Sequence, residues 1–552
     1  MQKYLILWLR NNLGLIALLF VSFLIYLPSL SGDFVIDDVL FIKDNPYIRD
    51  FSHITRFFTK GVFANSALEI ETQSIYRPMN LVPILLNYQV WGKNPVGYHI
   101  FLLLLHLINT CLVYAVIRKL VAGSAMSATM GAAMFALHPT RVESVAWING
   151  GVDPLVTFFL LGALLTHRSF VDSAHNKKEW RYLVLSLLCF QLALWSKEVA
   201  IVFPLIVVAH DLIYKKKINL PMAFLHAAVI AGYLITRSRV LGDIGKLNTI
   251  AASQFSRGID FALGYSELLV LPAQIPFYLQ SPEHAVSSAL GVISAVIIVV
   301  IAGFSWRTFN PDRKKTLLFS ALWMIGFFWP AVLLAFYAGG YYAARHLYVP
   351  MIGVAIFVAA FYDHVNVTYP RLKTPLMASC ALIMVFYGFI TLKEIPVWHD
   401  NGTIYRKIAS LAPGSTSGFL GLGQFYLLQE NYIEAEKNLL VALQNAKTPE
   451  DRVPSLVALG TIQGISNNLA LSERYLKEAV QIDPKNSEAW TGLGNLAWSN
   501  GRFHEAVSCY EKAVSIRPGN YEAVMNLAMA YENTGQSERG ALIRQQAAAI
   551  RR

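Results

Sequence analysis

The first 395 residues contain a series of long apolar runs, each close to the length that a helix needs to cross a membrane. A membrane-spanning helix needs about 20 mostly apolar residues. Because so many apolar helices cannot all be buried inside one soluble domain, the series predicts an all-α, polytopic membrane domain. The predicted spans, eleven in number, are 13–30, 98–117, 122–137, 144–166, 182–196, 199–214, 219–236, 284–304, 316–336, 346–362 and 374–392.

The composition and the distribution of charge support a membrane domain. The chain is 55% hydrophobic and 15% charged, whereas soluble proteins carry about 25% charged residues. The net charge of +11 comes mostly from short basic clusters between the apolar runs. Lys and Arg concentrate in cytoplasmic loops, so we interpret the clusters as topology signals and expect no nucleic-acid partner. They predict a multi-pass protein with a cytoplasmic N-terminus and an extracytoplasmic C-terminal region.

Two segments need separate interpretation. Residues 259–273 carry Glu267 and end in prolines, and their length favours a re-entrant or interfacial segment over a span. We interpret 13–30 as an uncleaved first helix, because no clear cleavage site follows it and many spans do. The four cysteines form no CxxC pattern, so we expect neither a disulfide framework nor a metal site.

The C-terminal part of the chain contains a repeat of the tetratricopeptide (TPR) type. The repeats begin near residues 416, 453, 487 and 521, and the 37-residue step from 416 to 453 indicates a three-residue insertion near "TPED". Such helix pairs stack into an α-solenoid whose groove usually binds peptides. We therefore expect a protein acceptor or partner in the groove, at positions that include Asn495, Trp498, Met525, Met529 and Asn533. The predicted domains are 1–395 for the membrane part, with a first extracytoplasmic loop at 31–96, then a linker at 396–415 and the repeats at 416–552.

Asp37 and Asp38 follow the first span directly, within "GDFVIDDVLFIKDNP". Adjacent carboxylates repel each other, which raises one pKa, and a partly dry site raises it further. Such a carboxylate suits a general base for an alcohol acceptor. The alternative is a helix cap, in which aspartate accepts hydrogen bonds from free backbone amides.

Further ionisable residues gather at the predicted extracytoplasmic ends of the spans. Arginine donates paired hydrogen bonds to phosphate, although an arginine at a helix end can also reach for lipid headgroups. Lys197 and Glu198 can instead pair with each other, and His138 and Glu143 can instead cap spans. The candidates for binding a donor phosphate are Arg345, Arg77, Lys197 and Arg237, and the candidates for lining a cavity are His138, Glu143, Glu198 and Tyr348.

A carboxylate base beside phosphate-binding cations suits one reaction in particular. A lipid carrier brings a sugar phosphate from the bilayer, the cations stabilise the departing phosphate, and the base takes the proton of a hydroxyl acceptor. A single displacement of this kind inverts the anomeric carbon. Its donor is a sugar carried on a lipid phosphate, and it requires no metal or other cofactor.

The motifs resemble those of the TMTC proteins, the transmembrane and tetratricopeptide repeat-containing O-mannosyltransferases of the GT-C class. The resemblance covers both halves of the chain and lies in "GDFVIDDVLFIKDNP", "IYRPMNLVPILLNY", "ALHPTRVESVAWINGGVDPL", "LALWSKEVAI" and "AARHLYVPMIG". It implies a GT-C fold and a polyprenyl-phosphate-linked hexose as donor, with Asp37 as base and Asp38 as its helper. It also places Arg345 in the family's "ERxLYLP"-like segment, where Ala344 replaces the acidic residue and no salt bridge to that position is expected. The family's "HPxxxE" and "KE" motifs match His138 with Glu143 and Lys197 with Glu198.

Three alternatives remain beside an O-mannosyltransferase-like enzyme that modifies protein Ser or Thr. A GT-C enzyme acting on a lipid or a cell-surface glycan shares all of the membrane motifs. A non-catalytic membrane anchor that presents the repeats as a scaffold is the second. A transporter is the third, but internal membrane repeats and broken helices near the midplane are not evident. Four repeats are few for the eukaryotic family, which favours a bacterial or archaeal relative whose sugar need not be mannose; a bacterial inner membrane is the location that we expect.

Overall fold

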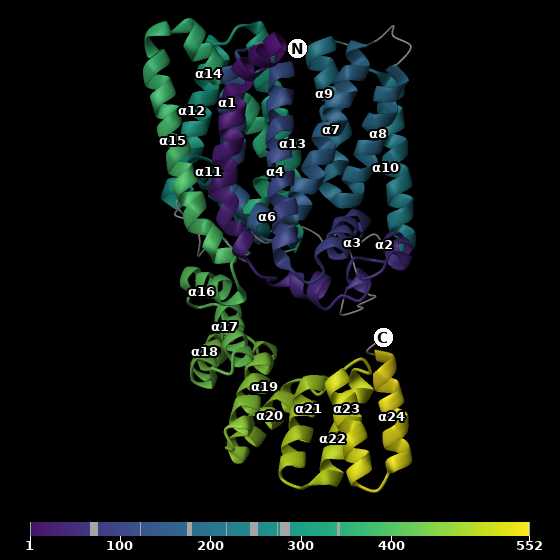
Figure 1. Ribbon diagram of the computed structural model, residues 1–552. Helices are drawn as coiled ribbons and strands as arrows, with labels where there is room; N and C mark the ends of the chain where they lie inside the picture. The colour runs from purple at the N-terminus through teal and green to yellow at the C-terminus, as the bar shows by residue number, and fades with distance from the viewer. Residues whose placement is uncertain are drawn as a thin grey trace. The chain divides into compact units, whose positions relative to one another are not determined.

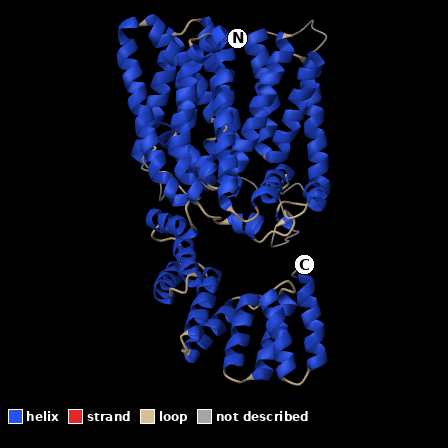
Figure 2. Cartoon of the chain, in the orientation of Figure 1, coloured by secondary structure: helices blue, strands red, loops and turns tan. Residues whose placement is uncertain are grey.

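The computed structural model describes residues 2–66, 75–121, 123–173, 179–216, 218–242, 252–272, 274–276, 288–338 and 343–550. Every regular element in these residues is helical (Figure 2), which confirms the all-α prediction. The chain divides into two compact units, Met1–Asp400 and Asn401–Arg552.

The first unit is a bundle of long apolar helices (Figure 1). Among the described residues, eight helical stretches are long and apolar enough to cross a membrane. The windows in Leu220–Leu241, Ala289–Thr308 and Pro370–Trp398 are each only 17% buried. Exposed apolar surface costs about 25 cal/mol per Å² in water, so these outer helices are suited to lipid. The helices that carry the eight stretches are α1 (Gln2–Tyr26), α4 (Pro95–Leu120), α7 (Val152–Asp172), α10 (Leu220–Leu241), α12 (Ser288–Thr308), α13 (Pro311–Ala338), α14 (Met351–Thr368) and α15 (Lys373–Glu394).

Three further predicted spans correspond to shorter helices. These are α5 (Ala125–Leu137), α8 (Glu179–Ser196), and α9 (Phe203–His210) with its π-helical continuation η8 (Asp211–Lys215). The total of eleven crossings stays a prediction. Residues 259–273 fall largely in α11 (Ala252–Val270). The Tyr265 hydroxyl of α11 bonds to the carbonyl of Ala343, just before η10 (Ala344–Leu347), and Leu263 meets Gly291 near the start of α12. α11 is not among the eight stretches that are long and apolar enough to cross a membrane, and the assignment of 259–273 as a re-entrant or interfacial segment stays a prediction.

Short helices and loops cover one end of the bundle, opposite the N-terminal label in Figure 1. Between α1 and α4, the chain folds over this end around a core that includes Phe34, Phe41, Leu85, Leu102 and Ile148. The core packs the described part of this loop against α4 and against the segment before α7. Its elements are η1 (Leu27–Ser31), η2 (Val39–Lys43), η3 (Phe51–His53), α2 (Ile54–Thr59), η4 (Phe63–Asn65) and α3 (Pro78–Trp91).

The same end receives three other connections. They are η5 (Pro139–Arg141), α6 (Val142–Ala146) and η6 (Asn149–Gly151) between α5 and α7; η7 (Glu198–Val202) between α8 and α9; and η10 between α13 and α14. At the far ends of these helices, Arg313 of α13 pairs with Asp363 of α14, and Lys215 of η8 pairs with Asp172 of α7.

The second unit consists of stacked helix pairs. The first helix of the second pair begins at Pro449, with Thr448 and Asp451 forming a capping box, and it has 17 residues where its counterparts have 13. The "TPED" insertion therefore extends a helix instead of lengthening a loop. The pairs are α17 (Thr416–Leu428) with α18 (Tyr432–Asn445), α19 (Pro449–Ile465) with α20 (Leu469–Ile482), α21 (Ser487–Ser499) with α22 (Phe503–Ile516), and α23 (Tyr521–Asn533) with α24 (Ser537–Ile550).

The predicted linker at 396–415 is mostly helical. Residues Ile395–Trp398 form the 3-10 helix η12, and Asn401–Leu411 form α16. Gly402 and Gly418 bring α16 and α17 into close contact, because an added Cβ would meet Phe425 at 2.3 Å and the Ala409 backbone at 2.7 Å. We therefore assign α16 to the repeat unit as a packed helix.

Candidate active site

A cavity of about 640 Å³ opens at the loop-covered end of the membrane unit. Segments far apart in the sequence build it: the first loop, the α6–α7 segment, the turn after α8, the end of α10, α13 and η10. The apolar part of the lining, called the apolar wall below, includes Phe41, Val62 and Phe327, with Pro330 inside α13. Six of the predicted site residues line the cavity: Asp37, Arg77, Lys197, Glu198, Arg237 and Arg345.

Asp37 and Asp38 occupy different environments. Asp37 is half-buried and lines the cavity. Asp38 is fully buried, and its two carboxylate oxygens accept hydrogen bonds from the backbone amides of Val35 and Asn149 at 3.1 and 2.8 Å. Ile36, directly before them, has a φ of 50°, which is rare for a β-branched residue and marks local strain of the kind found at functional sites. Asp38 thus anchors the turn that presents Asp37.

Burial raises the pKa of both carboxyl groups. For Asp37, burial outweighs the opposing effects of the Arg345 charge and of a hydrogen bond from the Asn149 side chain. The pKa of Asp38 is raised further, because burial and the nearby Asp37 charge outweigh its backbone hydrogen bonds. An aspartate with a raised pKa accepts a proton more readily than an ordinary one, which general base catalysis requires.

Glu198 joins two of the predicted phosphate-binding arginines. Arg77 donates from Nε and Nη2 to Glu198 Oε2 at 2.9 and 2.7 Å, and Arg237 donates to Oε1 at 3.3 Å. The pKa of Glu198 is lowered, because the charge and hydrogen bonds of Arg77 outweigh burial. The Arg77–Glu198–Arg237 cluster therefore carries one net positive charge.

Lys197 pairs with a different carboxylate. Its Nζ lies 2.6 Å from Oδ1 of Asp153, in the first turn of α7. Burial lowers the pKa of Lys197 although the Asp153 charge opposes this shift. The alternative of a mutual Lys197–Glu198 pair is wrong, since the two side chains bind different partners.

Arg345 forms an ion pair with Glu143. The two groups are 2.6 Å apart, the Arg345 backbone amide also donates to Glu143 at 3.0 Å, and the guanidinium lies 5.1 Å from the ring centre of Trp147. Glu143 is 1% exposed, and burial raises its pKa against the effect of Arg345. Glu143 therefore provides the carboxylate partner that Ala344, directly before Arg345, does not provide. Glu143 itself does not line the cavity and holds Arg345 from behind the lining.

His138 and Tyr348 lie in a buried layer beside the cavity and do not line it. The His138 ring contacts Thr140 Oγ1 at 2.8 Å and serves as the N-cap of η5, which is the capping alternative. The Tyr348 hydroxyl bonds to His106 Nδ1 at 2.8 Å, and Arg141 lies over its ring. Burial removes both residues from contact with a substrate in the cavity.

Three residues that the sequence analysis did not assign contribute to the site. Asn149 holds Asp38, Asp153 holds Lys197, and Trp147 packs on Arg345. All three lie in "WINGGVDP", where two glycines follow Asn149. A polar and aromatic segment of this kind inside the first part of the predicted span 144–166 was the signal available for them.

The arrangement combines a base, cations and an apolar wall. Among the described residues, the charged groups in the cavity lining are Asp37, Asp153 and Glu198 against Arg77, Lys197, Arg237 and Arg345. Lys197 and Arg345 are each neutralised by a paired carboxylate, so the unneutralised positive charge is that of the Arg77–Glu198–Arg237 cluster, and it favours an anion. A lipid-linked phosphate can place its chain against the apolar wall and its phosphate beside the arginines.

The membrane unit matches a known family model, described as dolichyl-phosphate-mannose-protein mannosyltransferase, over residues 78–237. This range contains Glu143, Asp153, Lys197, Glu198 and Arg237. Tetratricopeptide repeat models match residues 487–520 and 509–540.

Several named protein O-mannosyl-transferases are similar to this chain over most of its length. F38B6.6 of Caenorhabditis elegans is 27% identical over 79% of this chain and 63% of its own length. TMTC3 of Mus musculus is 21% identical over 91% and 60%, and TMTC2 of Homo sapiens is 24% identical over 72% and 58%. The chain thus spans about 60% of the length of these relatives.

The fold and these similarities define a multi-pass helical membrane protein that carries tetratricopeptide repeats and whose membrane unit is similar to the protein O-mannosyl-transferases. Within that class the chain is TMTC-like, because the similarity extends through the membrane unit and the repeats in the same order.

Proposed function

We propose that this protein is an inverting glycosyltransferase that moves a hexose from a polyprenyl-phosphate carrier to a hydroxyl acceptor. The observation that carries the proposal is the cavity in which Asp37, whose pKa is raised, faces a set of cations beside an apolar wall. The names of the relatives support the same class of reaction.

The reaction is a single displacement at the anomeric carbon. The acceptor oxygen attacks C1 of the sugar while its proton passes to the Asp37 carboxylate. The bond between C1 and the phosphate oxygen breaks, and the lipid phosphate leaves with the electron pair. Attack opposite the leaving group inverts the configuration at C1.

The Arg77–Glu198–Arg237 cluster suits the donor phosphate. A polyprenyl-phosphate sugar is a phosphodiester with one negative charge, which matches the one net positive charge of the cluster. When the bond to C1 breaks, the phosphate gains a second negative charge, and the nearby cations stabilise it. Arg345 acts on the base instead, because its charge lowers the pKa of Asp37 and stabilises the carboxylate form.

Protein Ser or Thr is the acceptor that we favour, and the extracytoplasmic side is the side of reaction. Tetratricopeptide repeats bind proteins, and their grooves usually accept peptides. In the repeat unit, a groove of about 650 Å³ includes Asn486, Asn495 and Asn520 with Glu488 and Glu522. A bacterial inner membrane would place this groove among exported proteins.

The test uses the full chain in lipid with a radiolabelled polyprenyl-phosphate hexose, mannose first, and an extract of extracytoplasmic proteins. We expect the parent to release lipid phosphate and to label protein, and Asp37→Asn to lose at least 100-fold of this rate, in line with loss of a general base. Asp44→Asn is the matched control, because Asp44 is an exposed aspartate of the same loop outside the cavity lining.

The outcomes separate the alternatives. Equal turnover by the parent and Asp37→Asn would remove Asp37 from the mechanism. Label in a lipid or glycan fraction would change the acceptor and keep the reaction. Absence of turnover with every polyprenyl-phosphate hexose would favour a non-catalytic scaffold.

A further inference from the structure

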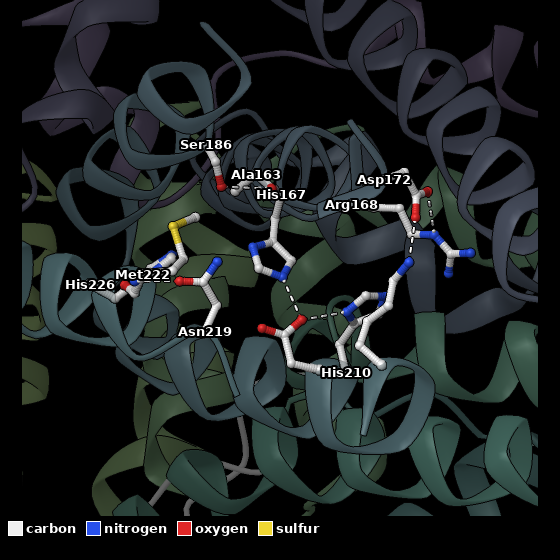
Figure 3. Close-up of polar contacts among 11 residues, drawn as sticks. Ala163, His167, Arg168, Asp172, Ser186, His210, Asn219, Met222 and His226 are labelled. Atoms are coloured by element: carbon white, nitrogen blue, oxygen red, sulfur yellow. Dashed lines mark hydrogen bonds and ion pairs between the residues drawn. The ribbon is translucent and has the colours of Figure 1, made fainter. Parts of the chain in front are cut away.

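A second polar cluster lies inside the membrane unit, away from the cavity. His167 of α7 and His210 and Asp211 at the junction of α9 and η8 meet there, and their ligand atoms all lie within 4.8 Å of one another (Figure 3). His167 follows Asp153 by 14 residues on the same helix, a rise of about 21 Å at 1.5 Å per residue. The cluster therefore stands about 21 Å from the Lys197–Asp153 pair, toward the other end of α7.

The local backbone turns two adjacent side chains toward the same partner. Neighbouring residues of a regular α-helix point about 100° apart, so they seldom share a partner. Here α9 ends at His210 and the π-helical η8 begins at Asp211. Asp211 bonds to His167, and the His210 ring lies 5.5 Å from the His167 ring between centres. Single π-turns within helices frequently occur at functional sites.

The three groups form one compact, buried set. Asp211 Oδ1 lies 2.9 Å from His167 Nε2 and 3.1 Å from His210 Nδ1, and the two rings are nearly perpendicular at 83°. The imidazole side chains are 0% exposed and the Asp211 side chain is 3% exposed. Burying a carboxylate is costly unless a cation or hydrogen-bond donors satisfy it.

Two of the three ligand-atom separations are close to those around a tetrahedral metal ion, and all three lie within 4.8 Å. Zinc binds imidazole nitrogen and carboxylate oxygen at about 2.0–2.2 Å, so two ligands of a tetrahedron lie about 3.3 Å apart. The measured separations of 2.9 and 3.1 Å need to widen only by a few tenths of an ångström. Two neutral imidazoles and one carboxylate are also a donor set that zinc prefers.

We propose that His167, His210 and Asp211 bind a divalent transition metal ion, with Zn²⁺ as the occupant, and that a water molecule takes the fourth position. The ion crosslinks α7 to the α9–η8 junction. Just beyond the cluster, Lys215 and Arg168 both pair with Asp172 at 2.7 and 3.2 Å, and this exposed ion-pair layer joins the same two elements. The role of the site is structural, and it does not depend on the proposed glycosyl transfer.

Sequence spacing gave no sign of this site. His167 and His210 are 43 residues apart and belong to different predicted spans, so no short motif links them. The expectation of no metal site rested on the absence of such a motif.

The experiment measures metal binding by the full-length protein in detergent. The protein is stripped with a chelator, dialysed and titrated with Zn²⁺ alone against a competing chelator, and bound zinc is counted by mass spectrometry. We expect one tightly bound zinc per chain, and a visible absorption spectrum typical of tetrahedral coordination when Co²⁺ replaces it. His167→Gln and Asp211→Asn should each weaken this binding roughly 100-fold or more, since even partners outside the ligand shell contribute 10–100-fold.

His364→Gln is the matched control. His364 is a buried histidine that follows an aspartate, Asp363, in α14, and it lies outside the cluster of ligand atoms. We expect this variant to keep the parental zinc affinity. If either ligand variant fails to fold, the test uses the parent protein alone. Its unfolding temperature should rise when Zn²⁺ is added and fall back when a chelator removes the ion.

Two results would overturn the proposal. One is that the parent binds no more zinc than Asp211→Asn does, and that zinc does not raise the unfolding temperature of the parent. The other is an equal loss of binding in His364→Gln and His167→Gln. Either result would make the cluster a hydrogen-bonded His–Asp–His set that carries no ion.

Discussion

The guanidinium of Arg345 lies 2.6 Å from the carboxylate of Glu143, although 202 residues separate them. Glu143 is 1% exposed and Arg345 is 17% exposed, so the pair is largely removed from water. Loss of one partner of a buried pair leaves an uncompensated charge and costs about 3–5 kcal/mol.

Arg345→Met should therefore destabilise the membrane unit strongly. It should lower stability more than Glu143→Gln does, because Glu143 is the more deeply buried partner and would be left charged. Burial raises the folded pKa of Glu143, and removal of Arg345 raises it further. A carboxyl group with a raised pKa stabilises the folded state at low pH, where it is protonated, and this effect is lost as pH rises. The stability difference between the parent and Arg345→Met should therefore shrink on acidification, because protonation neutralises the unpaired Glu143. Thermal unfolding of both variants and the parent across pH measures this, and a deficit independent of pH would contradict it.

The pH dependence of the reaction should reflect Asp37. Burial raises the pKa of this carboxyl, and the base acts only when deprotonated. The acid limb of the rate profile should therefore lie above the ordinary aspartate value of about 3.9. The Arg345 charge lowers the pKa of Asp37, so Arg345→Gln should move the limb to higher pH. Glycosyl transfer measured from acid to neutral pH tests this, with Asp44→Asn as a control that leaves the limb in place.

Arg77 should govern binding of the donor. Arg77→Gln removes the net positive charge of the Arg77–Glu198–Arg237 cluster and a pair of donors to Glu198. Charge-assisted hydrogen bonds contribute about 1.5–3 kcal/mol, so KM for the donor should rise roughly 10- to 100-fold while the acid limb stays in place. Arg77→Lys keeps the charge and loses the planar pair of donors, so it should recover part of the loss. A shift of the acid limb without a change in KM would show that Arg77 acts on the pKa of Asp37 and does not bind the donor phosphate.

The sequence predicted which residues gather at one end of the bundle, but not how they pair. The end of each span follows from its length and its flanking charges, so Arg77, Lys197, Glu198, Arg237 and Arg345 were all placed near the cavity. Pairing depends on the direction of each side chain. Lys197 has extended backbone angles and Glu198 begins the 3-10 helix η7, so these neighbours bind Asp153 and Arg77 respectively.

Burial was harder to predict than position. The "HPTRVE" segment contains polar side chains that pair within the protein layer beside the cavity, and His138 and Glu143 belong to it. A polar residue near a span end has the same sequence signature whether it faces a cavity or a buried partner. The repeats were predicted in more detail, since their periodicity fixes helix length, and only the extension of α19 by "TPED" changed the expected boundary.

The repeat unit offers a test of backbone conformation with a built-in control. Gly501 follows α21 with a φ of 71°, and Gly519 lies in the loop before α23 with no unusual φ; an added Cβ meets nothing within 4 Å at either glycine. Gly501→Ala should therefore cost about 1–2 kcal/mol through strain in the left-handed region alone. Gly519→Ala should be neutral or stabilise the unit by up to about 1 kcal/mol, because it restricts the unfolded chain. Hydrogen exchange of α21 and α22 in the full chain measures both effects, and equal protection in the two variants would show that the loop after α21 relaxes around the added methyl group.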